Sequence, residues 1–473
     1  MATAAAGPPR FPLRGRQPRV LDLGFIRFPL DEGMSACWWR TFFPALSLFL
    51  LTATFIVTKT GRDTLYFSMS AGLRDLPAAY LGIAVLSVPA AKGTLRLMRW
   101  LGPRRARVAG LAIMAAVQLT FYAVVRPGGG WVMTAIFILI PSLYGVLLSL
   151  SWLLGADLLD LAPRHVLARL YSTMGASSLL GALAGAALAR SLAPLIDPRS
   201  YFLLGAAGLM LTALVNAAAH RAFPVVMMRP MNDLPLPSTE GGELPGSQRI
   251  WPLLQDRYVA LLAAIALLGS ISGVLIEFQF YTIAAGRGSG ATAMFADFYL
   301  WINGAALALQ LFVTPPLQRR IGVNGSLFIL PLALVGAAAI TLATGSAAAR
   351  AGMRIAEGGL KSSVHRSNWE QSYLPVDRDS RSTVKLLVDG MAARVGESVA
   401  ALMLIAGVTM LDPGWITGVL LATTLSWLLL TILLRRNLGE EDLDALRPDL
   451  PIPDGCITVA TFGEGVQREM ESR

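Results

Sequence analysis

Long apolar runs recur along nearly the whole chain and are separated by short polar turns. A helix needs about 20 apolar residues to cross roughly 30 Å of hydrocarbon, and these runs reach that length. They lack the alternating positions of barrel strands, so helix is the structure that satisfies their backbone groups in lipid. The pattern predicts about twelve membrane-spanning helices, at 38–60, 76–98, 108–125, 131–156, 168–193, 201–220, 258–285, 292–318, 323–345, 347–368, 383–411 and 414–434.

The chain also repeats itself weakly, which favours two related halves. The sequence Arg-Trp-Leu-Gly at 99–102, after the second span, resembles Arg-Arg-Ile-Gly at 319–322, after the eighth. Gly181 in the fifth span has a counterpart in Gly396 of the eleventh. Such duplication is common in carriers, whose halves rock about a central site. The repeat and the even number of crossings support 347–368 as a span, although it is the least apolar segment.

These patterns predict an all-α membrane protein of two pseudo-symmetric six-helix bundles. The expected divisions are a cytoplasmic N-terminal tail, a first bundle, a cytoplasmic linker, a second bundle and a cytoplasmic C-terminal tail. Their boundaries are 1–37, 38–220, 221–257, 258–436 and 437–473. The linker is rich in Pro, Gly and polar residues, as expected for a connection between bundles.

Composition and charge support a lipid environment and give an orientation. The chain is 54% hydrophobic and 15% charged, outside the range of ordinary soluble proteins. Arginines gather before the first span and after the second and eighth spans, and such loops remain cytoplasmic. The net charge of +10 therefore indicates topology rather than nucleic-acid binding. We expect a multi-pass protein of the bacterial inner (cell) membrane with both termini in the cytoplasm.

The sequence offers no pattern for catalysis or for a bound cofactor. Cys37 and Cys456 are far apart and predict neither a disulfide nor a metal site. A Walker phosphate loop and a catalytic constellation are also absent from the sequence, so we expect no enzymatic activity. Nothing in the sequence calls for an oligomer, and a monomer is the simplest expectation.

Charged residues within the spans carry the functional prediction, because each costs at least about 2.5 kcal/mol at mid-membrane unless it is paired or faces water. In the tenth span Arg354, Glu357, Lys361 and His365 share one helical face. That face cannot meet lipid, so it is expected to line a polar pathway.

The seventh span holds the strongest single candidate. Glu277 lies well inside an apolar run, on one stripe with Ser270, Gly273 and Tyr281. We expect a transport role for this carboxylate rather than a structural one. The predicted substrate-binding and translocation residues are Arg62, Glu277, Arg354, Glu357, Lys361 and Lys385. The predicted coupling or gating residues are Asp63, Asp297 and Asp389.

Three segments resemble the ATP/ADP translocase (nucleotide transporter) family, a branch of the major facilitator fold. They are Lys-Thr-Gly-Arg-Asp-Thr-Leu at 59–65, Leu-Ile-Glu at 275–277, and Glu-Gln-Ser-Tyr-Leu-Pro-Val-Asp at 370–377 followed by Arg381, Lys385 and Asp389. The likeness extends over about 38–436, although only these segments are distinctive. It implies a carrier whose small anionic substrate is ATP or ADP, moved by alternating access. Nucleotide phosphates call for convergent Arg and Lys donors, which the spans supply.

The chain also departs from that family's pattern. The acidic position of the fourth span falls on Ser142, and the lysine of the first span falls on Arg62. A substrate ring could stack on Phe278, Tyr281 or Trp369, although packing is the commoner role of such rings. Two other functions stay open: a proton-coupled carrier of another small molecule, with Glu277 as proton site, and a non-transporting membrane scaffold or sensor. The absence of a continuous polar cavity would favour the scaffold or sensor function.

Overall fold

The computed structural model describes residues 19–22, 27–30, 32–68, 72–125, 130–159, 164–222, 253–284, 291–373, 375–376, 384–407 and 413–436. The chain divides into two compact units, Met1–Arg40 with Pro451–Arg473, and Thr41–Leu450. Most of the predicted linker, most of the N-terminal tail and the C-terminal tail with Cys456 lie outside the described residues. In the first unit, β1 (Arg19–Asp22) pairs antiparallel with β2 (Arg27–Leu30). The hydropathy pattern predicts no strands there.

The second unit is helical throughout its described part. The first half of the sequence forms five helices: α1 (Glu32–Phe67, which begins in the first unit), α2 (Gly72–Val124), α3 (Gly130–Leu159), α4 (Arg164–Leu192) and α5 (Ser200–Ala222). The second half forms α7 (Arg257–Ala284), α8 (Ala291–Ala308), α9 (Thr314–Ser326), α10 (Ile329–Thr344), α11 (Ala347–Leu360), α12 (Arg366–Gln371), α14 (Ala393–Gly407) and α15 (Pro413–Arg436). Short π-helical segments continue α8 as η3 (Leu309–Val313), α11 as η4 (Lys361–His365), and precede α14 as η5 (Leu386–Ala392).

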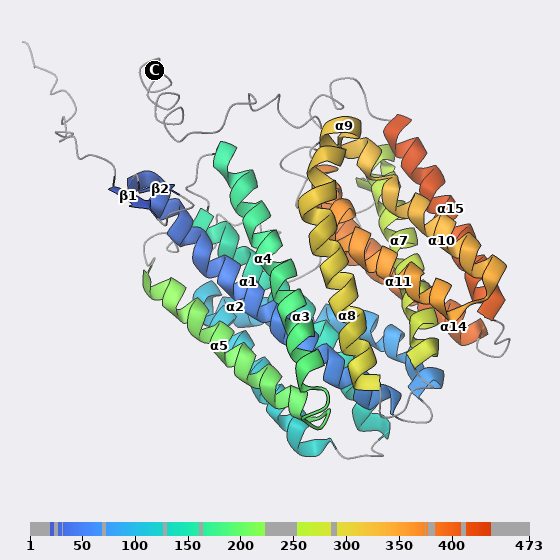
Figure 1. The fold of residues 1–473 in the computed structure, drawn as a ribbon, viewed down its shortest axis with the longest axis horizontal. Helices are drawn as coiled ribbons and strands as arrows, with labels where there is room; N and C mark the ends of the chain where they lie inside the picture. Colours follow the sequence, from blue (N-terminus) through green and yellow to red (C-terminus); the bar gives the residue numbers. More distant parts are fainter. Residues whose placement is uncertain are drawn as a thin grey trace, which may run out of the picture. The chain divides into compact units, whose positions relative to one another are not determined.

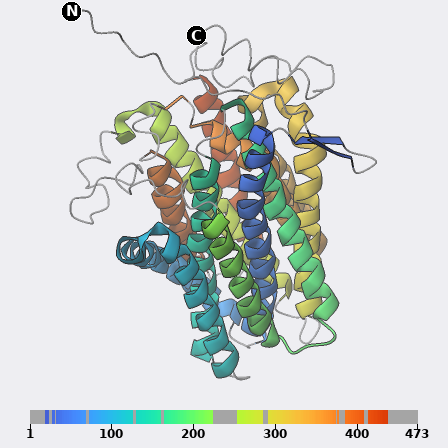
Figure 2. The same ribbon diagram turned by 90° about the vertical axis from the view of Figure 1, so that its left-hand side faces the viewer.

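Ten helical segments of the described chain are long and apolar enough to cross a membrane. Two of them, Gly72–Met98 and Arg104–Val124, belong to α2. The apolar α10 and the continuous helical run of α11, η4 and α12 account for the other two predicted spans. The prediction of an all-α, multi-pass membrane protein is therefore confirmed, and 347–368 is helical despite its charges. Figure 2 shows the long helices running side by side.

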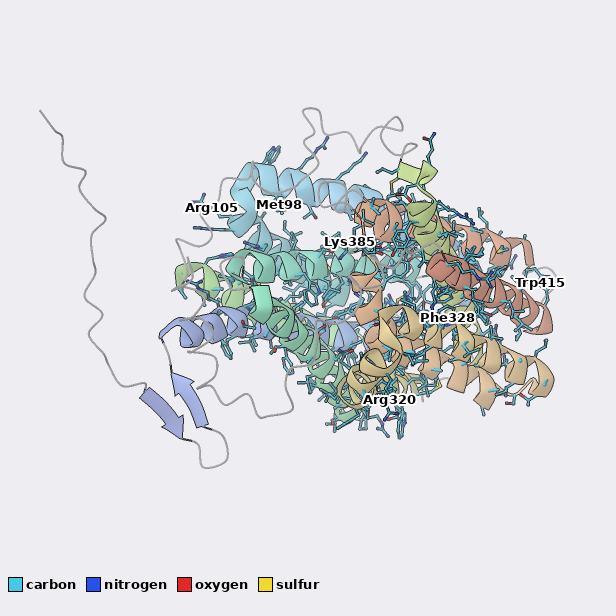
Figure 3. The ribbon with its side chains drawn as sticks, turned by 90° about the horizontal axis from the view of Figure 1, so that it is seen from above. Met98, Arg105, Arg320, Phe328, Lys385 and Trp415 are labelled. Carbon is cyan, nitrogen blue, oxygen red and sulfur yellow. The ribbon has the colours of Figure 1, made fainter. Side chains whose placement is uncertain are left out.

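Two glycines turn the chain at corresponding places in the two halves. Gly102 in α2 has φ 74° and ψ 159°, and Gly322 in α9 has φ 71° and ψ 177°. Positive φ is a conformation that glycine adopts without steric cost. These are the final residues of the two repeated sequences, so the repeat in sequence is also a repeat in backbone geometry. In Figure 3, Met98 and Arg105 mark the first turn, and Arg320 and Phe328 mark the region of the second.

Small residues allow the helices of each half to approach closely. A β-carbon at Gly181 of α4 would lie 2.2 Å from the Phe49 carbonyl oxygen of α1. A β-carbon at Gly396 of α14 would similarly lie 2.4 Å from the Leu267 carbonyl oxygen of α7. In each half, one of the paired glycines therefore lets two helix backbones approach closely, which is how helices commonly pack in lipid. The halves themselves meet where α4 packs on α8 and where α14 packs on α2 (Figure 1).

Candidate functional site

Glu277 of α7 is one of the carboxylates at which the two halves meet. Its Oε1 accepts a hydrogen bond from Lys59 Nζ of α1 at 3.4 Å. The same oxygen accepts a hydrogen bond from Arg354 Nη2 of α11 at 3.2 Å and lies 3.4 Å from the Tyr281 hydroxyl oxygen. Cations from both halves therefore neutralise one carboxylate, which lowers the cost of placing it at membrane depth.

The charges of α11 continue this cluster along the second half. Arg354 pairs with Glu357, and Lys361 Nζ donates to Glu357 Oε1 at 3.1 Å. Their spacing places the three side chains on one face, as the sequence predicts. Glu357 is buried, whereas the Lys361 side chain is 51% exposed. Gly273 of α7 leaves room for the pair, because a β-carbon there would lie 3.1 Å from Lys361 Nζ.

His365, the fourth member of the predicted stripe, lies in an aromatic cluster instead. Its ring stacks on Trp369 with centroids 5.5 Å apart and meets the edge of Trp427 at 5.6 Å. The five-residue π-helical segment Lys361–His365 explains the difference. A π-helical turn is wider than an α-helical turn, so the residues that follow no longer keep the α-helical register.

Asp63 connects the end of α1 to the second half. Its fully buried Oδ2 accepts hydrogen bonds from the Tyr281 hydroxyl of α7 at 2.9 Å and from the Tyr299 hydroxyl of α8. Its Oδ1 accepts from Arg62 Nε at 2.7 Å, and the Arg62 guanidinium lies 4.2 Å from the centroid of the Phe137 ring. We call Asp63, Tyr281 and Tyr299 the tyrosine latch. It joins the halves through neutral donors, while the charge of Asp63 is paired within α1.

A cavity of about 270 Å³ lies beside Glu277. The charge cluster forms one part of the cavity wall. Aromatic side chains of α1, α2 and α3 form another part. The cavity is lined by Phe55, Tyr80 and Phe137 and by the charged groups of Lys59, Arg62 and Glu277. Arg394 and Glu397 of α14 also line it and pair with each other at 2.7 Å, as their spacing predicts.

The structure brings six of the nine predicted site residues together. These six are Arg62, Asp63, Glu277, Arg354, Glu357 and Lys361. Asp297 is not among them. It pairs with Arg190 of α4 at 2.6 Å, and both side chains are 46% exposed. Asp297 therefore connects α8 to α4 at a more exposed position and does not line the cavity.

Lys385 and Asp389 belong to a third group, within the second half. Asp389 Oδ1 accepts hydrogen bonds from Trp369 Nε1 at 2.8 Å and from the Tyr373 hydroxyl at 2.7 Å. Lys385 Nζ lies 5.8 Å from the centroid of the Tyr373 ring. These contacts connect η5 to the end of the tenth span. Lys385 is labelled in Figure 3.

Ser142 does not replace the charge that the resembling family carries in its fourth span. Its hydroxyl donates to the Ile138 carbonyl oxygen at 2.8 Å and lies 3.4 Å from the Ile83 carbonyl oxygen. The side chain is buried between α3 and α2. The fourth span therefore contributes the Phe137 ring to the site, in place of a carboxylate.

Sequence reasoning missed Lys59, Tyr80 and Phe137 as site residues. Lys59 stands one turn before Arg62, and its positive charge inside the apolar first span was a usable signal. Tyr80 and Phe137 had none, because aromatic residues in apolar helices usually pack against other helices. Phe278, which the sequence offered for stacking, is instead a buried core residue.

Comparison with known proteins identifies the fold. No family model and no curated protein sequence matches the chain. The solved nucleoside transporter NupG matches over 84% of this chain and 100% of its own, with a TM-score of 0.56 and 11% identity. A bacterial homologue of the iron transporter ferroportin, in an outward-facing state, matches over 83% of this chain and 100% of its own, with a TM-score of 0.53 and 15% identity. The chain is thus a multi-pass membrane protein of major facilitator-like fold.

Proposed function

We propose that this chain is a carrier that moves a small organic anion across the membrane by alternating access. The observation that supports this most is the charge cluster shared by the two halves beside a cavity. Four cations, Lys59, Arg62, Arg354 and Lys361, stand against three carboxylates, Asp63, Glu277 and Glu357. The excess positive charge can be neutralised by an anion that enters the cavity.

Within this class, a nucleotide is the first candidate. The three segments that resemble the ATP/ADP translocase family include Lys59, Arg62 and Glu277, all of which line the cavity. A nucleoside transporter shares the fold, which adds nucleoside-containing anions to the compounds worth testing. The resembling family has an acidic residue where this chain has Ser142. ATP-for-ADP exchange is therefore one of several modes of nucleotide transport to be tested.

The transport step would use the two contacts between halves near Glu277. An anionic group that binds Lys59 competes with Glu277 for the same ammonium. The competition loosens the Lys59–Glu277 pair, and the tyrosine latch then remains to be broken before the halves can rock. The cavity would open alternately to the two sides of the membrane.

Uptake into proteoliposomes tests this function. The purified full-length chain should take up, or exchange, at least one labelled anion from a panel of ATP, ADP, AMP and non-nucleotide organic anions. Exchange that needs internal nucleotide would support the nucleotide proposal. Uptake that is driven by an imposed proton gradient and is independent of internal nucleotide would support the proton-coupled alternative. A chain that moves none of these compounds would contradict the carrier proposal.

The predicted topology also has a direct test. Because the positive residues concentrate in loops of one parity, both tails and the linker are expected in the cytoplasm of a bacterial cell. Reporter fusions placed after His220 and after Arg436 should therefore both report the cytoplasmic side. A fusion after Arg199, in a loop of the other parity, serves as the external control. An external signal from either of the first two would overturn this orientation.

A further inference from the structure

Three aromatic rings form one part of the cavity wall. Phe55 comes from α1, Tyr80 from α2 and Phe137 from α3, so all three belong to the first half. The rings of Tyr80 and Phe137 lie 6.4 Å apart in an edge-to-face arrangement. A flat, apolar part of a ligand would find van der Waals and ring contacts here. The charged groups of Lys59 and Glu277 line the same cavity.

The Tyr80 side chain is only 5% exposed, and its hydroxyl has no hydrogen-bond partner among the described residues. Leaving a buried hydroxyl unpaired costs free energy, so such a group calls for an explanation. Other buried tyrosines near it differ. The hydroxyl of Tyr144 bonds to Gln118, and those of Tyr281 and Tyr299 bond to Asp63.

Tyr66 provides a useful contrast, because its buried hydroxyl also lacks a partner in the described part of the chain. The Tyr66 ring packs on Phe137 with centroids 4.3 Å apart, but the residue does not line the cavity. Tyr80 does, together with the charged groups of Lys59 and Glu277. An unpaired hydroxyl, an aromatic wall and a charge cluster therefore coincide only at Tyr80 among the described tyrosines.

We propose that Tyr80 is a specificity-determining residue, whose hydroxyl bonds to an acceptor atom of a ring-bearing organic anion. The ring of that anion packs against Phe55 and Phe137, and its negative charge faces Lys59. This inference rests on the proposed function and narrows its substrate class to compact anions that carry a flat ring. A cavity of about 270 Å³ suits such a compact group, because it lies near the lower limit for ligand pockets.

The experiment compares matched anions that differ by the ring. One pair is AMP and ribose 5-phosphate, and the other is quinolinate and maleate. Uptake of each labelled probe is measured in proteoliposomes and normalised to the amount of monodisperse, folded protein. We expect the ring-bearing member of at least one pair to enter at least about tenfold faster, a preference typical of a pocket that binds an entire ring.

The Tyr80→Phe variant removes the hydroxyl and keeps the ring. It should slow uptake of the ring-bearing probe about three- to tenfold, as expected for one lost hydrogen bond, and leave the ring-free probe unchanged. Tyr122→Phe is the matched control, because Tyr122 lies in the neighbouring span Arg104–Val124 and does not line the cavity. It should transport like the unmodified protein.

Two further outcomes separate this inference from the function on which it rests. Uptake without a preference for rings, or equal uptake by Tyr80→Phe and the unmodified protein, would overturn the inference and leave the carrier proposal intact. If none of the four probes enters, the result counts against the anion-carrier proposal, and the Tyr80 inference is rejected with it. Should Tyr80→Phe yield little folded protein, Phe137→Leu, which shortens the same aromatic wall, is expected to reduce the ring preference instead.

Discussion

Replacing Glu277 with glutamine is expected to lower substrate uptake or exchange at least about tenfold, which corresponds to about 1.4 kcal/mol in the controlling step. The amide keeps the shape and the hydrogen-bonding capacity of the side chain but removes the charge that Lys59 and Arg354 neutralise. Insertion and abundance should survive, because Arg354 keeps Glu357 as a partner. Initial rates in proteoliposomes, at matched amounts of folded protein, measure the effect.

Asp297→Asn is the comparison for this substitution. It also removes a carboxylate that pairs across the two halves, but its pair with Arg190 is half exposed, and exposed pairs contribute little. We expect less than about a twofold change from it. Normal flux in Glu277→Gln would refute the transport role. Loss of the folded protein would instead indicate a structural ion pair, and Lys59→Glu combined with Glu277→Lys should then restore abundance.

Removing both hydroxyls of the tyrosine latch is expected to shift the protein toward the state in which the two halves are separated at the latch. Tyr281 and Tyr299 each donate a hydrogen bond to the buried Asp63. Hydrogen bonds to charged groups contribute about 1.5–3 kcal/mol each, so losing two changes the ratio of open to closed molecules by at least about a hundredfold. The measurement uses Phe295→Cys in a background without native cysteines, because Phe295 is buried beside the latch.

In that background, Tyr281→Phe with Tyr299→Phe should make the cysteine react much faster with a membrane-impermeant thiol reagent added on the side of the membrane that the predicted topology makes external. Tyr144→Phe is the matched control. It removes an equally buried hydroxyl whose hydrogen bonds, to Thr58 and Gln118, stay within the first half. An unchanged labelling rate in the double variant would show that the latch does not hold the halves together.

The sequence was sufficient to predict the fold, because a bilayer restricts the secondary structure that a membrane-spanning segment can adopt. Apolar length set the helices and positive loops set the expected orientation. The weak repeat that ends at Gly102 and Gly322 indicated two related halves, and the structure adds that both glycines have positive φ. The second and third predicted spans are two separate membrane-crossing segments, Gly72–Met98 and Arg104–Val124, on either side of the non-helical Gly102. The pair of strands Arg19–Asp22 and Arg27–Leu30 was missed, because each strand has only four residues.

The site could be predicted only where charge gave a signal. Arg354, Glu357 and Lys361 could be assigned to one face by their spacing, and Glu277 by its isolation in an apolar run. Their partners could not be assigned, because the Lys59–Glu277 contact joins residues far apart in sequence. The π-helical segment at 361–365 changed the register after Lys361, which no spacing argument anticipates. The aromatic wall could not be predicted, because in the sequence its residues resemble the other aromatic residues that pack between helices.

The distribution of charge between the halves bears on the kinetics of the empty carrier. Within the charge cluster, the contribution of the second half is neutral, because Arg354 and Lys361 balance Glu277 and Glu357. The first half contributes one excess cation, because Lys59 and Arg62 face only Asp63. When the halves separate at this level, Lys59 loses its counter-ion to the opposite wall. In a loaded carrier, the bound anionic substrate replaces this counter-ion of Lys59. In an empty carrier, no anion replaces it. The return of the unloaded protein should therefore be the slow half of the cycle, and one-for-one exchange should outpace net flux.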